Sequence, residues 1–600
     1  MKKISTVLSM SVVSMILSVF LFGCGPVNEL TVSSDDGQVT SVSNDTLTRF
    51  SDMDFTEMDA LEFSKYLGNG INLGNTMEAT GPDLATDLSV SAYETYWGQP
   101  VTTPEMIQGM KDCGFDTIRI PVAWTNMMDY KNGDYTIDSA YLDRVEEIVN
   151  YALDADMFVI INDHWDKGWW AMFGSSNETT VQAAFDLYES MWKQVAERFK
   201  DYSDMLIFES ANEELGNSLN NNALWSDSGS LTENQQYEMT NTINQNFVDI
   251  IRNSGGNNYD RFLLIAGYNT DFDKTLDDRF VMPTDTANGK LLVSVHYYTP
   301  WNYCGAETQA SWGIKSEYEE MNNQFAKLTK FTDQGYGVII GEYSAIPLWN
   351  NGNPIPKENT VEFMTNLLDN CDLYNYVPVL WSTNDLYDKS TCTMINDEIK
   401  ELFAGRSYAS EVQKADSYID EAKTRMEEAM SNAPDHREGT VFYDDGTPVA
   451  WIMWNGGAGT YSVGDVFNPD DNTMGITATN AIVEGEGEYT VSLDFAGGND
   501  GLTFAALALA DGELLYPGCI LNIKEITYDG EPVELIAKPY TSSDDGLCTR
   551  VNLYNEWVGD VPDDARSMGH DLTGTSPVII DKTKISGIKN ITITFELIMP

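Results

Sequence analysis

Basic residues are scarce in this chain. Its 600 residues include 35 Lys plus Arg against 93 Asp plus Glu, which gives a formal net charge of −58. A surface this acidic repels a phosphate backbone, so we expect no nucleic acid among its partners. The acidity otherwise indicates a well solvated surface.

Cysteine and histidine are also rare, with seven and four copies. The cysteines form none of the Cys-x-x-Cys or Cys/His clusters that zinc sites require, so we expect no metal. Disulfides are permitted if the protein is exported, and the sequence leaves their pairing open.

Long hydrophobic runs are lacking after the first 22 residues. Lys2 and Lys3 precede an apolar run from Val7 to Phe22, an order typical of a secretory leader. The run ends in Gly23 and Cys24, which resembles a bacterial lipoprotein signal in which the Cys24 thiol carries diacylglycerol.

We therefore predict a signal peptide at residues 1–23 and a flexible tether, rich in Ser, Thr and Asp, at residues 24–56. The protein is expected to be exported and held on a membrane through lipid at Cys24. An ordinary secretion signal and an uncleaved anchor stay open as alternatives.

The chain has enough apolar material for substantial cores, with 42% hydrophobic and 11% aromatic residues. Its length exceeds one ordinary domain, so two or more folded units are expected. Between residues 57 and 408, eight short apolar runs recur, and helical patterns follow most of them. The predicted strands are 70–75, 117–122, 157–165, 205–213, 262–269, 291–298, 337–344 and 376–382.

Eight such units in about 350 residues fit an α/β fold of the (β/α)8 or TIM-barrel type. A doubly wound open sheet is the rival fold. Polar residues gather near the carboxyl ends of the strands, where a barrel places its active site, and this favours the barrel.

Two glutamates follow buried strands four and seven. Glu213 closes the sequence Ser210-Ala211-Asn212-Glu213, and Glu342 follows Ile340 and Gly341. Strands four and seven face each other across a barrel, so the two carboxylates can converge. Such a pair can break a glycosidic bond with no metal or organic cofactor, and we expect none.

These residues resemble glycoside hydrolase family 5, the cellulase-rich family of clan A barrels, over roughly residues 57 to 405. Residues 70–76, with the sequence GINLGNT, are similar to its first-strand signature, and residues 115–122, with the sequence FDTIRIPV, to its second strand. The resemblance implies that Glu213 is the acid/base and Glu342 the nucleophile, that Arg119 orients the nucleophile, and that Asn212 binds the sugar 2-hydroxyl.

Further positions match the family at other strand ends. The resemblance places His296 near the acid/base, Tyr298 near the nucleophile and Trp381 beneath the sugar ring. His164 falls where the family has a histidine at strand three, although a lone histidine is more often structural. We favour a functional role because His164 lies among the other candidates.

The chain departs from the family at three places. Many members have a second histidine at Trp165, a proline at Glu214, and an aspartate at Ser382, so subfamily and subsite preference stay open. Loop tryptophans that could add sugar platforms, each equally explained by packing, are Trp97, Trp124, Trp169, Trp170, Trp301 and Trp349.

A second domain follows the barrel. Residues 409–435 are predicted to form a helical linker, and residues 436–600 to form an all-β sandwich resembling a jelly roll. Its place beside a polysaccharide hydrolase suggests a carbohydrate-binding module, with a structural brace as the alternative. Candidate stacking residues are Trp451, Trp454, Tyr461, Tyr554 and Trp557.

The sequence thus predicts a monomeric, retaining endo-β-1,4-glucanase (a cellulase) whose partner is a polysaccharide substrate, a cellulose-like or mixed-linkage β-glucan. A xyloglucanase or mannanase on the same barrel is an alternative, because loops set specificity. A surface glycan-binding lipoprotein without catalysis is the alternative from another class.

Overall fold

The computed structural model describes residues 49–81, 87–307, 309–350, 352–406, 416–437, 447–463, 469–543, 548–559 and 561–600. The predicted signal peptide, Cys24 and most of the tether lie outside these residues. No helix in the described ranges is long and apolar enough to cross a membrane.

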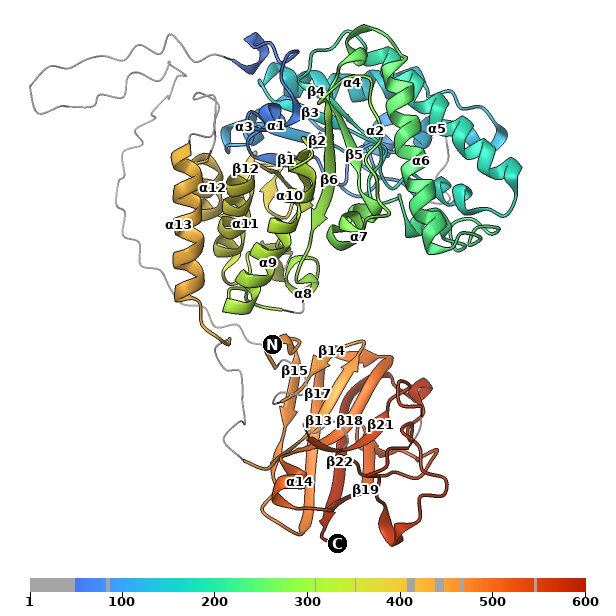
Figure 1. Cartoon of the computed structure of the whole chain (residues 1–600), viewed down its shortest axis with the longest axis vertical. Helices are drawn as coiled ribbons and strands as arrows, with labels where there is room; N and C mark the ends of the chain where they lie inside the picture. Colours follow the sequence, from blue (N-terminus) through green and yellow to red (C-terminus); the bar gives the residue numbers. More distant parts are fainter. Residues whose placement is uncertain are drawn as a thin grey trace, which may run out of the picture. The chain divides into compact units, whose positions relative to one another are not determined.

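Eight parallel strands close into a barrel in the order β1-β10-β7-β6-β5-β4-β3-β2 (Figure 1). The predicted (β/α)8 barrel is therefore confirmed, and the open doubly wound sheet is excluded. Each strand coincides with a predicted run. The strands are β1 (Gly70–Asn72), β2 (Thr117–Ile120), β3 (Phe158–Ile161), β4 (Leu206–Glu209), β5 (Leu263–Ala266), β6 (Leu291–Tyr297), β7 (Gly337–Tyr343) and β10 (Val377–Leu380).

Amphipathic helices surround the barrel and bury one face each. Side-chain caps begin several of them; Thr232 and Gln235 form a capping box at α6, for example. The helices of this region are α1 (Ala60–Ser64), α2 (Val90–Glu94), α3 (Pro104–Asp112), α4 (Ser139–Asp154), α5 (Glu178–Phe199), α6 (Glu233–Arg252), α7 (Phe272–Leu276), α8 (Trp301–Cys304), α9 (Lys315–Lys327), α10 (Thr329–Thr332), α11 (Thr360–Tyr374) and α12 (Asp397–Ala404).

The strand residues alternate between two cores. Ile160, Ile207 and Ile339 belong to a cluster that also contains Phe55 and Phe63 from the segment before β1. Their neighbours in sequence pack instead against the helices. By the same alternation, the side chains of Arg119 and Glu209 face the inside of the barrel. Both residues lie near the carboxyl ends of their strands.

Two short hairpins lie in loops beyond the carboxyl ends of strands. One pairs β8 (Leu348–Asn350) with β9 (Asn353–Ile355), and the other pairs β11 (Tyr387–Asp388) with β12 (Thr393–Met394).

Helix α13 (Asp416–Asn432) packs against α11 of the barrel. The guanidinium of Arg425 donates to the carboxylate of Asp369 at 2.7 Å, and Arg406 reaches the same carboxylate at 3.0 Å. The helix in the predicted linker is thus packed against the barrel.

The C-terminal region is all β, as predicted, with the addition of the short α14 (Gly512–Leu515). Two five-stranded antiparallel sheets share one hydrophobic core. One sheet contains β13 (Val449–Gly456), β14 (Gly459–Tyr461), β16 (Ala481–Ile482), β18 (Leu502–Ala510) and β21 (Cys548–Tyr554). The other contains β15 (Ile476–Thr479), β17 (Gly487–Asp500), β19 (Ile520–Tyr528), β20 (Glu531–Pro532) and β22 (Ser586–Ile598).

Most of the aromatic residues predicted to stack on sugars in this domain are core residues. Trp451, Trp454 and Tyr554 are buried and pack between or against the sheets, so their prediction as stacking residues is wrong. Trp557 is different, because 70% of it is exposed.

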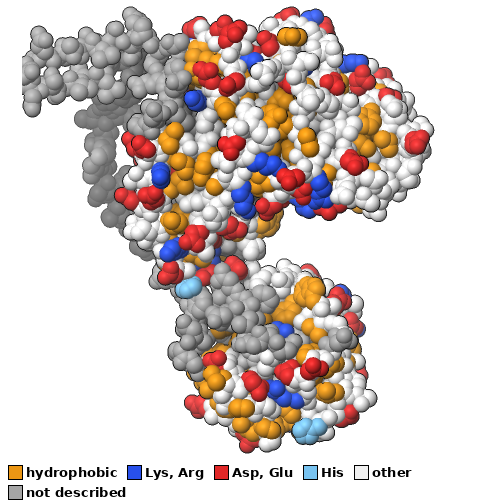
Figure 2. Space-filling view, in the orientation of Figure 1, with side chains coloured by type: hydrophobic (Ala, Val, Ile, Leu, Met, Phe, Trp, Pro, Cys, Tyr) orange, Lys and Arg blue, Asp and Glu red, His pale blue; other side chains and the backbone are white. Residues whose placement is uncertain are grey.

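Acidic side chains are dispersed over the face of the protein that Figure 2 shows. On the face shown in Figure 2, acidic side chains are scattered over both the barrel and the sandwich and do not gather in one patch. This distribution agrees with the solvated surface expected from the composition.

Candidate active site

Arg119 lies at the centre of a buried polar network inside the barrel mouth. It is fully buried on β2, and its guanidinium donates to four side chains. Nε reaches Glu209 at 2.6 Å, Nη1 reaches Glu342 at 2.9 Å and Asn72 at 3.0 Å, and Nη2 reaches Asn212 at 2.8 Å. One cation therefore orients side chains from β1, β4, β7 and the loop after β4.

Glu342 is buried near the end of β7. Besides Arg119, the Tyr298 hydroxyl donates to Glu342 Oε2 at 3.1 Å. Burial and the nearby Glu213 raise the pKa of Glu342, while Arg119 and this hydrogen bond oppose the rise. The two donors hold the carboxylate in one orientation and favour its ionised form.

Glu213 lies four residues beyond Glu209, the last residue of β4, at the floor of an open cleft. Its Oε1 is 2.8 Å from His296 Nδ1, and Asn269 Nδ2 donates to its backbone carbonyl at 2.8 Å. Half of the side chain, 51%, faces the cleft, yet the surrounding protein desolvates the carboxyl and raises its pKa, with Arg119 in opposition. A raised pKa suits a carboxylic acid that must carry a proton.

His296 stands between the two carboxylates. Its Nδ1 is 2.8 Å from Glu213 Oε1 and 3.5 Å from Glu342 Oε2. Burial lowers the pKa of His296 to about 4, so the imidazole is neutral at neutral pH. A neutral ring can hydrogen-bond to Glu213 without adding charge that would drive off its proton.

The separation of the carboxylates is chemically informative. A carboxylate oxygen of Glu213, a ring nitrogen of His296 and a carboxylate oxygen of Glu342 all lie within 4.8 Å of one another. Retaining glycosidases hold their carboxyl groups about 5 to 5.5 Å apart, whereas inverting enzymes leave roughly 6.5 to 9.5 Å for a water. The observed spacing fits direct attack by one carboxylate.

His164 and Trp381 complete the group of predicted barrel residues. Their rings are stacked, with centroids 5.7 Å apart and planes 11° from parallel. Burial lowers the pKa of His164 well below its usual value, with Arg119 and His296 acting in the same direction. His164 is thus a neutral ring that fixes the plane of Trp381.

The structure brings all eight predicted barrel residues into one site, and it adds three that sequence reasoning missed. Asn162 Nδ2 donates to Glu209 Oε2 at 2.9 Å, and Asn72 Nδ2 donates to the Gly341 carbonyl at 3.0 Å. In the sequence, Glu209 is marked only as an acid at the end of a buried apolar run, four residues before Glu213. An acid after a buried run is also what marks Glu342.

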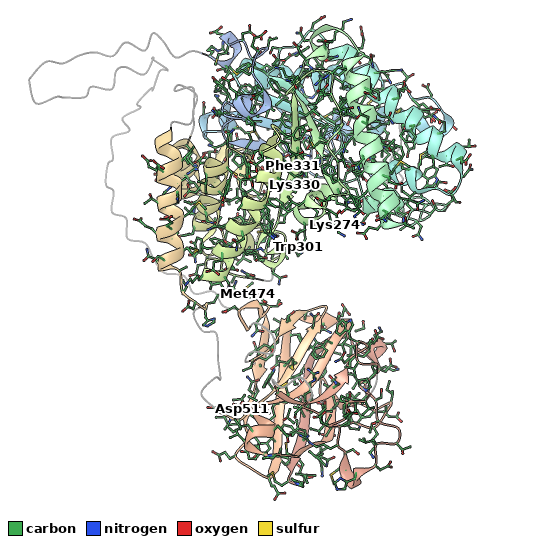
Figure 3. The ribbon with its side chains drawn as sticks, in the orientation of Figure 1. Lys274, Trp301, Lys330, Phe331, Met474 and Asp511 are labelled. Carbon is green, nitrogen blue, oxygen red and sulfur yellow. The ribbon has the colours of Figure 1, made fainter. Side chains whose placement is uncertain are left out.

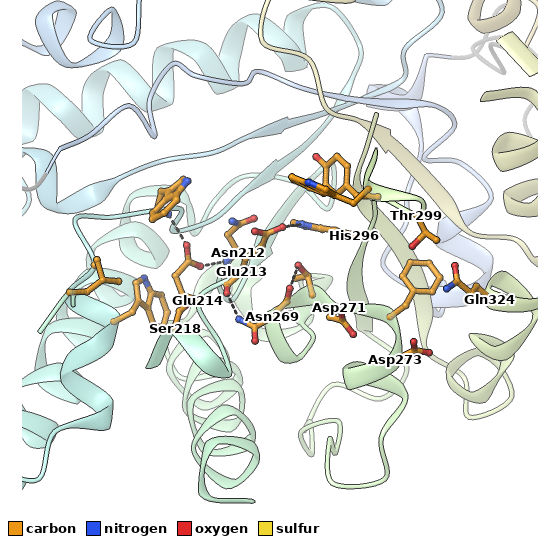
Figure 4. A pocket seen from close by; sticks show the side chains of 18 residues that line it. Asn212, Glu213, Glu214, Ser218, Asn269, Asp271, Asp273, His296, Thr299 and Gln324 are labelled. Atoms are coloured by element: carbon orange, nitrogen blue, oxygen red, sulfur yellow. Dashed lines mark hydrogen bonds and ion pairs between the residues drawn. The ribbon is translucent and has the colours of Figure 1, made fainter. Parts of the chain in front are cut away.

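A cavity of about 420 Å³ opens beside Glu213 (Figure 4). The loops after β3, β4, β5 and β6 form its walls. Figure 4 shows Glu213 and Glu214 side by side, with Asn269 next to them. Other residues that line the cavity include Trp165, Trp170, Leu224, Phe272, Tyr298 and Trp301.

The predicted loop platforms divide into buried and exposed tryptophans. Trp124 and Trp169 are fully buried, so their prediction as sugar platforms is wrong. Trp301, labelled in Figure 3, is 61% exposed on α8, which follows β6. Trp165, one of the departures from the family, is 57% exposed.

A closed parallel barrel with two convergent carboxylates at its mouth fits the site of a glycoside hydrolase. The family model described as Cellulase (glycosyl hydrolase family 5) matches residues 77–386, more than half of the chain. The chain belongs to this family, and the prediction of a glycoside hydrolase is confirmed.

Several known proteins are similar to the barrel. Endoglucanase A of Paenibacillus barcinonensis is 33% identical over 361 residues, 56% of this chain and 85% of that protein. The structure of a broad specificity endoglucanase from Ruminococcus champanellensis with bound cellotriose is 28% identical, covers 58% of this chain and 98% of its own, and gives a TM-score of 0.51. A Bacteroides ovatus xyloglucanase in complex with a heptasaccharide is 28% identical, covers 62% and 84%, and gives a TM-score of 0.50.

Proposed function

We propose that the chain is a retaining endo-β-1,4-glucanase acting on cellulose-like or mixed-linkage β-glucans. The observation that carries the proposal is the approach of Glu213 and Glu342 within 4.8 Å. Arg119 donates to Glu342, and His296 lies beside both carboxyl groups. The endoglucanases among the similar proteins support β-glucan as the substrate class.

The reaction proceeds in two displacements. The Glu342 carboxylate attacks the anomeric carbon and forms an ester, while the Glu213 proton passes to the departing glycosidic oxygen. A water oxygen then attacks the same carbon and releases Glu342, and the water proton returns to Glu213. Two inversions at one carbon give net retention.

The surrounding residues stabilise each state. Arg119 and Tyr298 hold Glu342 as a charged nucleophile, and Asn212 is placed beside Glu213 to bind the sugar 2-hydroxyl. Trp381 provides an apolar platform for the C–H face of the ring.

The direct test is reducing-end release from carboxymethylcellulose, barley β-glucan, xyloglucan and mannan. Wild type is expected to cleave the first two, and Glu342→Gln to lose activity by roughly 10³-fold or more because the nucleophile is gone. Glu238→Gln, an exposed carboxylate on α6, is the matched control.

Xyloglucanase activity is the second candidate, favoured by the similarity to the Bacteroides ovatus enzyme. Xyloglucan as the preferred polymer would establish it, and mannan as the preferred polymer would establish a mannanase. Inactivity of wild type on all four polymers would contradict the proposed β-glucanase activity and would leave two readings, a substrate outside this panel or a surface glycan-binding protein.

We also propose that the protein is exported and anchored through lipid at Cys24. The support is the leader sequence alone, with its basic start, apolar run and terminal Gly23-Cys24. Fractionation of a bacterial host that makes the full chain tests it: wild type is expected with the membranes, and Cys24→Ser is not. Equal distribution of the two would contradict lipid anchoring.

The sandwich is proposed to bind glucan through Trp557. Trp557 is the only one of the five candidate aromatics that is largely exposed, and its ring lies 6.3 Å from that of Phe504. Adsorption of Glu342→Gln and of Glu342→Gln/Trp557→Ala to insoluble cellulose tests this. Equal retention of the two proteins would favour the structural brace.

A further inference from the structure

Trp165 occupies an unusual position in the loop after β3. It is 57% exposed and lines the cavity beside Glu213. Its backbone has φ of +60°, a left-handed conformation that a bulky residue rarely adopts. An exposed indole held in a costly conformation indicates that the surrounding structure fixes it for a purpose.

The carboxyl group of Glu214 provides that fixation. Its Oε1 accepts a hydrogen bond from the backbone N–H of Trp165 at 2.7 Å, and its Oε2 accepts one from the N–H of Asn212 at 2.8 Å. Glu214 is 8% exposed, so both bonds are shielded from water. One side chain therefore ties the Trp165 backbone to the residue that precedes Glu213.

Two further acids secure the same loop. Asp163 accepts a hydrogen bond from Trp170 Nε1 at 2.9 Å, and Asp166 accepts one from the Thr125 backbone N–H at 2.9 Å. Both carboxyls are fully buried. The loop is thus fixed on both sides of Trp165, and the exposed indole is set on a rigid support.

The position of the cavity identifies what Trp165 faces. Among the described residues that line it, Glu213 is present, whereas Glu342 and Trp381 are not. The acid delivers its proton to the departing oxygen, so the part of the substrate that leaves lies on the Glu213 side of the cleft. A sugar on the leaving side of the bond would therefore enter this cavity.

We propose that Trp165 binds a glucosyl ring of the leaving-group portion of the chain, and that Glu214 is the residue that positions it. The indole offers a flat apolar surface to the C–H face of that ring. This inference rests on the proposed function, because it assigns Glu213 as the acid.

Two substrates separate this role from catalysis. Cellopentaose places sugars on both sides of the scissile bond, whereas β-cellobiosyl fluoride has a leaving group too small to reach Trp165. Trp165→Ala is expected to lower kcat/KM on cellopentaose roughly tenfold, as loss of one aromatic contact does, and to leave fluoride hydrolysis within about twofold. Trp165→Phe should restore most of the loss.

Glu214→Gln tests the positioning role. Gln has one acceptor oxygen, so one of the two backbone N–H groups would face an amide NH₂. We expect Glu214→Gln to lower kcat/KM on cellopentaose more than on β-cellobiosyl fluoride. The double variant Trp165→Ala/Glu214→Gln should lower kcat/KM on cellopentaose no more than Trp165→Ala does. Tyr259→Ala, an exposed aromatic before β5 at the opposite end of the barrel, is the control.

The outcomes are distinct. If Trp165→Ala lowers kcat/KM equally on both substrates, or does not lower it on cellopentaose, the assignment of Trp165 is overturned. Additive losses in the double variant would overturn the positioning role of Glu214. If wild type hydrolyses neither substrate, the proposed function itself fails, and the assignment fails with it.

Discussion

Arg119 shares its positive charge between two buried carboxylates, Glu209 and Glu342. The ion pairs are 2.6 and 2.9 Å long, and all three side chains are buried. If Arg119 paired with Glu342 alone, the ion pair would hold the Glu342 carboxylate tightly and make it a poor nucleophile. The second acid moderates that effect, because each carboxylate competes for the same guanidinium.

Glu209→Gln should therefore lower the pKa of Glu342, since Arg119 would then interact with one full negative charge. The acid limb of the kcat/KM profile is expected to move to lower pH, and the maximum rate to fall roughly tenfold. A pH profile on cellotetraose measures both effects. An unmoved acid limb would show that Glu209 has only a structural role.

The raised pKa of Glu213 has a consequence at high pH. The pKa shift keeps the acid protonated, so kcat/KM on cellotetraose should fall as pH rises through the Glu213 pKa. Fluoride departs without a proton, so the same limb should be absent with β-cellobiosyl fluoride. Parallel profiles for the two substrates are the measurement, and an identical alkaline limb in both would contradict the acid assignment.

Glu213 and Glu342 were predictable because each follows a buried run in a pattern that resembles a known family. Glu209 and Glu214 were not assigned, since their roles depend on partners distant in sequence or on backbone groups. Glu209 pairs with Arg119, 90 residues away. No local pattern specifies such a pair.

Among the strands, β7 shows how the backbone makes room for the site. A Cβ on Gly341 would lie 2.7 Å from Ser294 Oγ and 3.1 Å from His296 Nε2. Glycine therefore lets the imidazole pack directly on the strand that carries Glu342.

Gly341→Ala is expected to displace His296 and to destabilise the fold by about 1 to 3 kcal/mol, the usual range for overpacking. The activity should fall together with the melting temperature. Thermal unfolding and kcat/KM on cellotetraose measure the two effects. Gly497→Ala is the control, because no atom lies within 4 Å of its added Cβ; equal behaviour of the two variants would contradict the packing argument.

All eight strands were predictable from their apolar runs, but their ends were not. The third run was expected to extend to Trp165, whereas β3 ends at Ile161. Beyond that point the chain leaves the sheet to present Asp163 and His164, and Trp165 turns into a left-handed conformation. Apolar character predicts burial, whereas strand length depends on which neighbour continues the hydrogen-bonded ladder.

Taken together, the barrel and the sandwich have separate hydrophobic cores. The sequence predicted this division from the change of pattern after the eighth strand. It could not predict which sandwich aromatics face water, because alternation in a strand does not say which of two faces is covered.

A chain that ends at Arg437 retains α13 and its ion pair with Asp369. We expect it to fold and to keep kcat/KM on soluble cellopentaose within about twofold of the full chain, since separate cores behave as separate folding units. Kinetics and thermal unfolding of the shortened protein measure this. Loss of folding would show that the barrel depends on the sandwich.

The central claim is that Glu342 attacks the sugar directly and that the reaction retains configuration. Proton NMR of the first reducing ends released from cellotetraose measures this, before the anomers equilibrate. The close carboxylates predict the β-anomer as the first product. The α-anomer as the first product would mean attack by water in one step, and would contradict the roles assigned to both glutamates.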